Sequence, residues 1–129
     1  MKQLRFLKFW LALGWLLVGL VIFLSLIPSP PEPPGFPGVD KLLHLSAYAM
    51  MMLWFGFIYR RGKRYRCIGL IFIMIGLILE FIQGATGYRS MDLFDMSANT
   101  LGVLSGWLLA KTRFSSLLIQ VEERIAYFV

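Results

Sequence analysis

The sequence predicts an all-α fold: a polytopic membrane protein built as a four-transmembrane-helix bundle with a short interfacial C-terminal helix. Hydrophobic residues make up 58% of the 129 residues and charged residues only 16%, and the mean hydropathy is +0.71. The apolar residues form long runs rather than amphipathic stripes, and so small a chain cannot bury all of them internally. The lipid bilayer must therefore solvate them, and the chain has room for one domain, residues 1–129.

The net charge of +6 comes from Lys and Arg residues in short clusters at the ends of the apolar runs. A nucleic-acid-binding protein would instead spread them along a surface that faces the nucleic acid. We therefore expect the lipid bilayer, and no nucleic acid, as a partner. The single Cys67 cannot form an internal disulfide and is given no role. The oligomeric state is not indicated by the sequence.

The first span is predicted over residues 9–27, directly after Lys2, Arg5 and Lys8. Its length of about 19 residues, at roughly 1.5 Å per residue, nearly matches a hydrocarbon core of about 30 Å. A cleaved signal peptide would have a shorter apolar stretch and a small-residue cleavage site, which residues 24–28 do not offer. We therefore favour a signal anchor.

Residues 28–38 contain all six prolines of the chain, so no helix can continue through this stretch. An extended polyproline-like spacer is expected there. The second span is predicted over residues 42–59, with Asp40 at the N-cap or in the first turn, where a carboxylate meets unpaired amide groups.

Residues 60–66 form a short loop with five basic residues, the strongest kind of positive-inside signal. The third span follows over residues 67–85, a turn occupies 86–91, and the fourth span covers 92–110. The tail, residues 111–129, is too charged to span and is expected to lie at the interface. All but two of the 13 Lys and Arg residues then fall on one side, the exceptions being Lys41 and Arg89. The predicted topology is multi-pass, with both termini cytoplasmic.

Ionisable residues are costly at hydrocarbon depth and usually face a bundle interior or a wet cavity. On the fourth span, helical spacing places Asp92, Asp95, Asn99, Gly102 and Gly106 within one stripe. Its polar half lies toward the outer surface. Its inner half consists of the small residues Gly102 and Gly106, a Gly-x-x-x-Gly pair that allows close helix packing.

The second and third spans carry matching polar groups at a similar depth. Asp40, His44 and Tyr48 follow one another at one-turn intervals, and Glu80 shares a face with Gln83. Three helices could thus direct polar side chains into one outward-facing pocket. The alternative for each residue alone is structural: an interfacial ion pair worth about 1 kcal/mol or less, a packing histidine, or hydrogen bonds between helices.

These polar positions occur in the order Asp40-Lys41-x-x-His44-x-x-x-Tyr48, Glu80-x-x-Gln83 and Arg89-x-x-Asp92-x-x-Asp95-x-x-x-Asn99-x-x-Gly102. The set resembles the signature of the VanZ-like family over residues 28–110. The resemblance implies a small bacterial membrane protein of the cell envelope, related to a founding member linked to resistance to the glycopeptide teicoplanin. With the predicted topology, this implies a location in the bacterial cytoplasmic (inner) membrane. The motif positions, which we predict to bind a ligand, are Asp40, Lys41, His44, Glu80, Gln83, Arg89, Asp92, Asp95 and Asn99.

Three functions fit these residues. The first is a binding or envelope-modulating protein that recognises a lipid-linked or peptide-like envelope component, or a glycopeptide. The excess of carboxylates in the pocket favours a cationic or amine-bearing partner, or a shared proton. The second function is an enzyme acting on a lipid-linked envelope substrate, with His44, Glu80 and Asp95 as candidate catalytic residues. No metal-binding spacing supports a metal-dependent version, and no cofactor is expected. Proton-coupled transport ranks third, because the inner halves of the spans carry no matching polar line.

Overall fold

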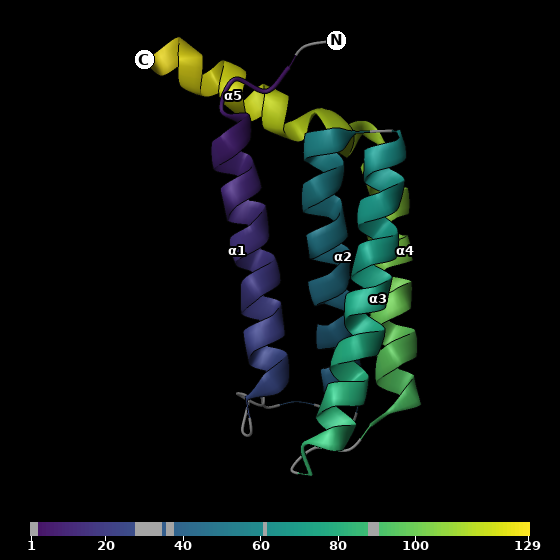
Figure 1. Cartoon of the computed structure of the whole chain (residues 1–129). Helices are drawn as coiled ribbons and strands as arrows, with labels where there is room; N and C mark the ends of the chain where they lie inside the picture. The colour runs from purple at the N-terminus through teal and green to yellow at the C-terminus, as the bar shows by residue number, and fades with distance from the viewer. Residues whose placement is uncertain (1–2, 28–34, 36–37, 61, 88–90) are drawn as a thin grey trace.

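The structure, a computed structural model, describes residues 3–27, 35, 38–60, 62–87 and 91–129. Every regular element in these ranges is helical, as predicted (Figure 1). The elements in chain order are α1 (Leu7–Leu26), α2 (Val39–Tyr59), α3 (Lys63–Ala85), α4 (Leu93–Ala110), the 3-10 helix η1 (Arg113–Ser116) and α5 (Leu117–Phe128).

Helices α1 to α4 run side by side along a common axis, and α5 lies across the end of the bundle where both termini are found (Figure 1). We call this the terminus end. Among the described helices, α1, α2 and α3 are long and apolar enough to cross a membrane, which makes the chain a multi-pass membrane protein. Helix α4 has 18 residues, and Asp95 and Asn99 within it lower its hydropathy.

The helix bounds lie within a few residues of the predicted spans. The largest difference is at α3, which begins at Lys63 rather than at residue 67, because the basic residues after Gly62 already have helical geometry. Asp40 lies in the first turn of α2, as one of the two expected positions. The proline-rich prediction for 28–38 and the turn at 86–91 fall largely outside the described residues.

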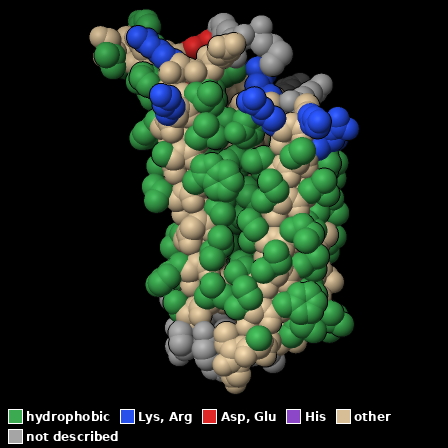
Figure 2. Space-filling view, viewed as in Figure 1, with side chains coloured by type: hydrophobic (Ala, Val, Ile, Leu, Met, Phe, Trp, Pro, Cys, Tyr) green, Lys and Arg blue, Asp and Glu red, His purple; other side chains and the backbone are tan. Residues whose placement is uncertain are grey.

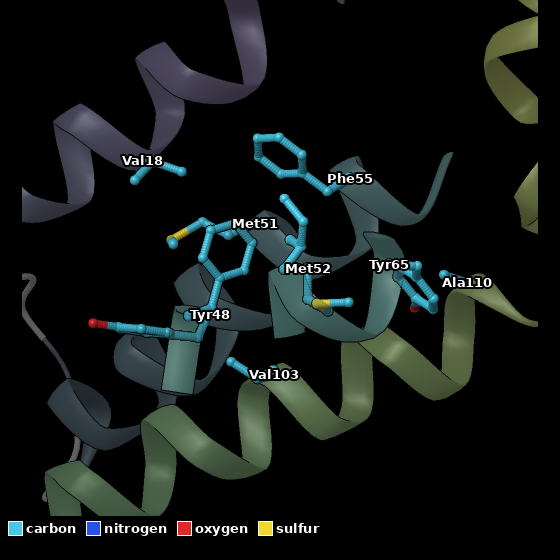
Figure 3. Close-up of a cluster of buried hydrophobic side chains, with 10 residues drawn as sticks. Val18, Tyr48, Met51, Met52, Phe55, Tyr65, Val103 and Ala110 are labelled. Atoms are coloured by element: carbon cyan, nitrogen blue, oxygen red, sulfur yellow. The ribbon is translucent and has the colours of Figure 1, made fainter. Parts of the chain in front are cut away.

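The core is organised around α2, which packs against α1, α3 and α4. Met51, Met52 and Phe55 of α2 are fully buried with Phe72 of α3 and Val103 of α4. Figure 3 shows side chains from all four helices meeting in this cluster. On the face shown in Figure 2, apolar side chains form a hydrophobic belt along the helices, with Lys and Arg gathered at the terminus end. This is the distribution expected of a membrane bundle.

Helices α2 and α4 make the most extensive contact in the bundle, and two glycines make it possible. A Cβ atom at Gly102 would overlap the carbonyl oxygen of Leu45, and one at Gly106 would overlap that of Ala49. Because these neighbours are backbone atoms, no side-chain movement could relieve the overlap. The predicted packing role of the Gly-x-x-x-Gly pair agrees with this geometry.

Candidate ligand-binding site

Lys41 is the centre of a group of charged side chains at the end of the bundle opposite the termini. Its Nζ atom lies 2.6 Å from Asp95 Oδ1, 2.6 Å from Asp92 Oδ2 and 2.9 Å from Asp40 Oδ2. Asp40 and Lys41 open α2, whereas Asp92 and Asp95 open α4. The ammonium group therefore joins the N-terminal ends of two helices, where carboxylates also interact favourably with the helix dipoles.

Asp92 and Glu80 connect this group to α3. Asp92 is the N-cap of α4, and its Oδ1 accepts a hydrogen bond from Phe94 N at 2.8 Å, a common capping geometry. Its own backbone N–H donates to Glu80 Oε1 at 2.7 Å. The Glu80 side chain is buried, with 1% exposure. A carboxylate of α3 thus orders the start of α4.

His44 and Asn99 lie one helical turn further into the bundle. His44 Nδ1 is 3.0 Å from Asn99 Oδ1, so the ring nitrogen is the donor of this hydrogen bond. Gly76 of α3 makes room for Asn99 and for Tyr48 of α2: a Cβ atom there would lie 3.2 Å from Asn99 Cβ and 3.3 Å from Tyr48 Cε1. The three helices therefore meet at Asn99.

We call the seven residues that converge here the polar cluster: Asp40, Lys41, His44, Glu80, Asp92, Asp95 and Asn99. Gln83 points elsewhere, because its Nε2 donates to the carbonyl oxygen of Ser25 in α1 at 2.6 Å. It joins α3 to α1 rather than contacting Lys41. Arg89 lies outside the described residues.

Burial and charge are graded across the polar cluster. Its deepest members are Glu80 and Asn99, with 1% and 4% exposure. Its solvent-facing rim is formed by Asp40, Lys41 and Asp92, with side-chain exposures of 60%, 32% and 33%. Asp95 Oδ1 is buried and accepts no well-aligned hydrogen bond from the described residues, although Lys41 Nζ is close to it. Three aspartate carboxylates thus share one ammonium group, and the cluster is net negative among the described side chains.

Asp92, which precedes α4, has a pKa below its ordinary value. The hydrogen bond from the Lys41 ammonium group is the main cause, and the bond from Phe94 N adds to it. Both donors favour the charged carboxylate. Asp92 therefore stays ionised at neutral pH and holds Lys41 in place.

The chain matches the VanZ/LLP1 family model over residues 3–118. It belongs to the VanZ/LLP1 family. The match extends beyond the motif region of residues 28–110 and includes α1, so the first span is part of the VanZ/LLP1 domain.

A protein of the fission yeast Schizosaccharomyces pombe, described as uncharacterized, is 30% identical over 96 residues, which cover 71% of this chain and 56% of the yeast protein. This VanZ/LLP1 chain therefore spans little more than half of that relative. No solved structure matches this chain.

Among the described residues of this VanZ/LLP1 protein, no three His, Cys, Asp or Glu side chains are arranged to hold a metal ion. What the polar cluster offers instead is a set of hydrogen-bond acceptors with negative charge around an ammonium position. Such a set can bind amines and other cationic donors.

Sequence reasoning assigned no role to Glu122, yet its carboxylate is a central contact at the terminus end. It accepts hydrogen bonds from Arg5 N at 2.6 Å, Phe6 N at 3.0 Å and Trp10 Nε1 at 2.6 Å. Glu122 thereby satisfies amide groups at the start of α1 from a distant part of the chain. The available signal was an acidic residue at helical spacing from the apolar residues Leu118 and Ile125 of the tail.

Proposed function

We propose that this VanZ/LLP1 protein binds an amine-bearing component of the cell envelope at the polar cluster. The observation that carries the proposal is the position of Lys41 Nζ, within 2.9 Å of carboxylate oxygens of three aspartates. An ammonium group with three N–H donors fits this position. The excess of carboxylates leaves capacity for a second ammonium group from a ligand.

The depth of the cluster supports a lipid-linked or membrane-adjacent ligand. Asp40, with 60% side-chain exposure, and Lys41 with 32% lie at the rim, whereas Asp95 lies deeper. A ligand amine that approaches along the membrane surface would meet Asp40 and Asp92 first. Asp95 would then stabilise the bound charge in surroundings from which water is largely excluded, where ion pairs are stronger.

The proposal includes a specific topology. We place α4 as a fourth span, because it runs beside α2 through the same layer as α1 and α3. The basic residues at the terminus end then place both termini in the cytoplasm of a bacterial cell by the positive-inside rule. The polar cluster would face the outside of the inner membrane, where envelope components are assembled.

The binding test uses purified protein in nanodiscs and dihexanoyl phosphatidylethanolamine, a short-chain lipid with a primary amine, as the probe. N-acetylated dihexanoyl phosphatidylethanolamine, which lacks the positive charge, is the matched control ligand. We expect Asp95→Asn to weaken binding of the amine form by about tenfold or more, the usual range for one charged hydrogen bond. Isothermal titration calorimetry measures both affinities.

Glu123→Gln, which removes a carboxylate at the terminus end, serves as the control variant and should bind like the unmodified protein. Thermal unfolding of each variant checks that the fold is retained. Equal affinity for the two probes, or unchanged affinity in Asp95→Asn, would contradict the proposal. Conversion of a lipid-linked probe to product would favour the enzymatic alternative with His44 and Glu80.

The resemblance to the VanZ-like family suggests a phenotype that can be tested, which is resistance to teicoplanin. If the polar cluster acts in glycopeptide resistance, expression in a susceptible bacterium should raise the inhibitory concentration of teicoplanin, and Asp95→Asn should abolish the increase. Equal inhibitory concentrations with the unmodified chain and with an empty vector would separate this phenotype from the binding activity.

A further inference from the structure

Helix α5 has one face that is buried at its start and uncovered at its end. Leu118 and Glu122 are buried against the bundle, with 3% and 7% exposure. Ile125 follows Leu118 by seven residues and so lies on the same helical face; it is 42% exposed, and the neighbouring Phe128 is 84% exposed. The apolar face therefore continues beyond the part of the bundle that covers it.

The hydrogen bonds of Glu122 fix the level at which this face emerges. They join α5 to Arg5 N and Phe6 N, immediately before α1 begins at Leu7. In Figure 1 the C-terminal part of α5 projects past α1 rather than over the other helices. The uncovered face thus lies beside the first turn of a membrane span, at the boundary between headgroups and hydrocarbon.

Basic side chains surround this position. Arg5 and Lys8 at the start of α1 and Arg124 on α5 are exposed. Of the two carboxylates in α5, Glu122 is already engaged by α1, and Glu123 is exposed. Figure 2 shows Lys and Arg at this end directly above the hydrophobic belt. The local charge is complementary to anionic headgroups.

We propose that the last turn of α5 is a membrane-surface contact that binds anionic phospholipid. Ile125 and Phe128 insert at the edge of the hydrocarbon, and Arg5, Lys8 and Arg124 contact phosphate groups of the lipid. Tyr127, which lies about 200° around the helix from Ile125, faces water. This surface is independent of the polar cluster at the opposite end.

The test places one environment-sensitive fluorophore on the full-length protein in nanodiscs. In a Cys67→Ser background, Ile125→Cys and Tyr127→Cys are labelled separately, and brominated phosphatidylcholine serves as the quencher in the lipid. We expect strong quenching at position 125 and little at position 127. Quenching at 125 should increase when phosphatidylglycerol replaces part of the phosphatidylcholine.

A second variant tests the charge component without touching the apolar face. Arg5→Gln, Lys8→Gln and Arg124→Gln combined should lower the enrichment of phosphatidylglycerol over phosphatidylcholine around the protein, by up to about fivefold for each charge removed. Native mass spectrometry of protein with retained lipid measures the ratio. Equal quenching at both positions, or no dependence on phosphatidylglycerol, would overturn the proposal. So would crosslinking of two chains through position 125, because a second copy would then cover the face.

Discussion

Single side chains decide how the polar cluster is held together. Lys41 draws Asp40, Asp92 and Asp95 to one point, and the N–H of Asp92 brings in Glu80. Charge-assisted hydrogen bonds of this kind are stronger than neutral ones, and they also impose geometry. The cluster therefore holds the N-terminal ends of α2 and α4 in place, whether or not it also binds a ligand.

The lowered pKa of Asp92 predicts how this order depends on pH. The stabilisation by an ionised Asp92 is complete above the ordinary aspartate pKa of about 4 and is lost as the pH falls through the lowered value. Asp92→Asn keeps a good N-cap residue but removes the charge. We expect the variant to be less stable than the unmodified protein at pH 7, with the difference disappearing in acid.

Thermal unfolding in detergent at a series of pH values measures this effect. Glu123→Gln serves as a charge control at the other end of the bundle. A constant difference between the Asp92→Asn variant and the unmodified protein at all pH values would argue against an ionic role of Asp92.

At the level of helices, two kinds of contact set the geometry of the bundle. The close approach of α2 and α4 depends on residues without side chains at Gly102 and Gly106. The attachment of α5 to α1 depends on a carboxylate that supplies acceptors for the start of α1. Neither contact depends mainly on apolar burial. In lipid, apolar burial gives little driving force for helix association, because the lipid tails are as apolar as the side chains.

Gly102→Ala should destabilise the protein by about 1–3 kcal/mol, because the added methyl group overlaps the backbone of α2. The same change should also disturb the polar cluster, since Asn99 is less than one turn away on α4. Gly19→Ala is the matched control: it is also within a helix, but a Cβ atom there meets nothing within 4 Å. Thermal unfolding in detergent should show a loss of stability for Gly102→Ala alone.

Glu122→Ala should release α5 from α1. Although burial alone would raise the pKa of Glu122, the hydrogen bonds from Phe6 N, Arg5 N and Trp10 Nε1 lower it overall, so the carboxylate is ionised at neutral pH. Removing it leaves these donors without their acceptor, at a cost of about 1–3 kcal/mol. Hydrogen exchange should become faster in α5 and at the start of α1, and Glu123→Ala should change it far less.

The sign of the pKa shift adds a pH dependence to this contact. The stabilisation from Glu122 is present above the ordinary glutamate pKa and is lost as the pH falls through the lowered value. Exchange in α5 of the unmodified protein should therefore increase in acid toward the rate in Glu122→Ala. Equal exchange rates in the two proteins at neutral pH would rule out this role.

The whole molecule has two chemically different ends. The polar cluster lies where α2 and α4 begin, whereas α5 and the basic residues visible in Figure 2 lie at the terminus end (Figures 1 and 2). A membrane with an aqueous phase on each side accommodates this asymmetry without charge in the hydrocarbon. Our proposed topology adds which end faces which side: the terminus end faces the cytoplasm and the polar cluster faces the outside.

Cysteine labelling tests that topology in intact bacterial cells. In a Cys67→Ser background, a membrane-impermeant maleimide should label Asp40→Cys from outside, and should label Lys63→Cys and Lys111→Cys only after permeabilisation. Lys63 begins α3 and Lys111 follows α4, so the pair reports on both ends of the segment that contains the third and fourth proposed spans. Labelling of Lys111→Cys from outside would contradict α4 as a span with a cytoplasmic C-terminal end.

The sequence by itself determined the helical membrane class, the approximate helix bounds, the VanZ-like relationship and the stripe of α4 that contains Asp95, Asn99 and Gly102. It could do so because hydropathy, helical periodicity and the cost of charge in lipid act locally along the chain.

Only the tertiary structure decided which partners the long polar side chains contact. Lys41 bridges two helices instead of pairing only with Asp40, Gln83 turns to Ser25 of α1, and Glu122 binds the start of α1. Long polar side chains can reach several partners from one backbone position. The spacing of the helices, set by contacts such as Gly102 against Leu45, selects among them.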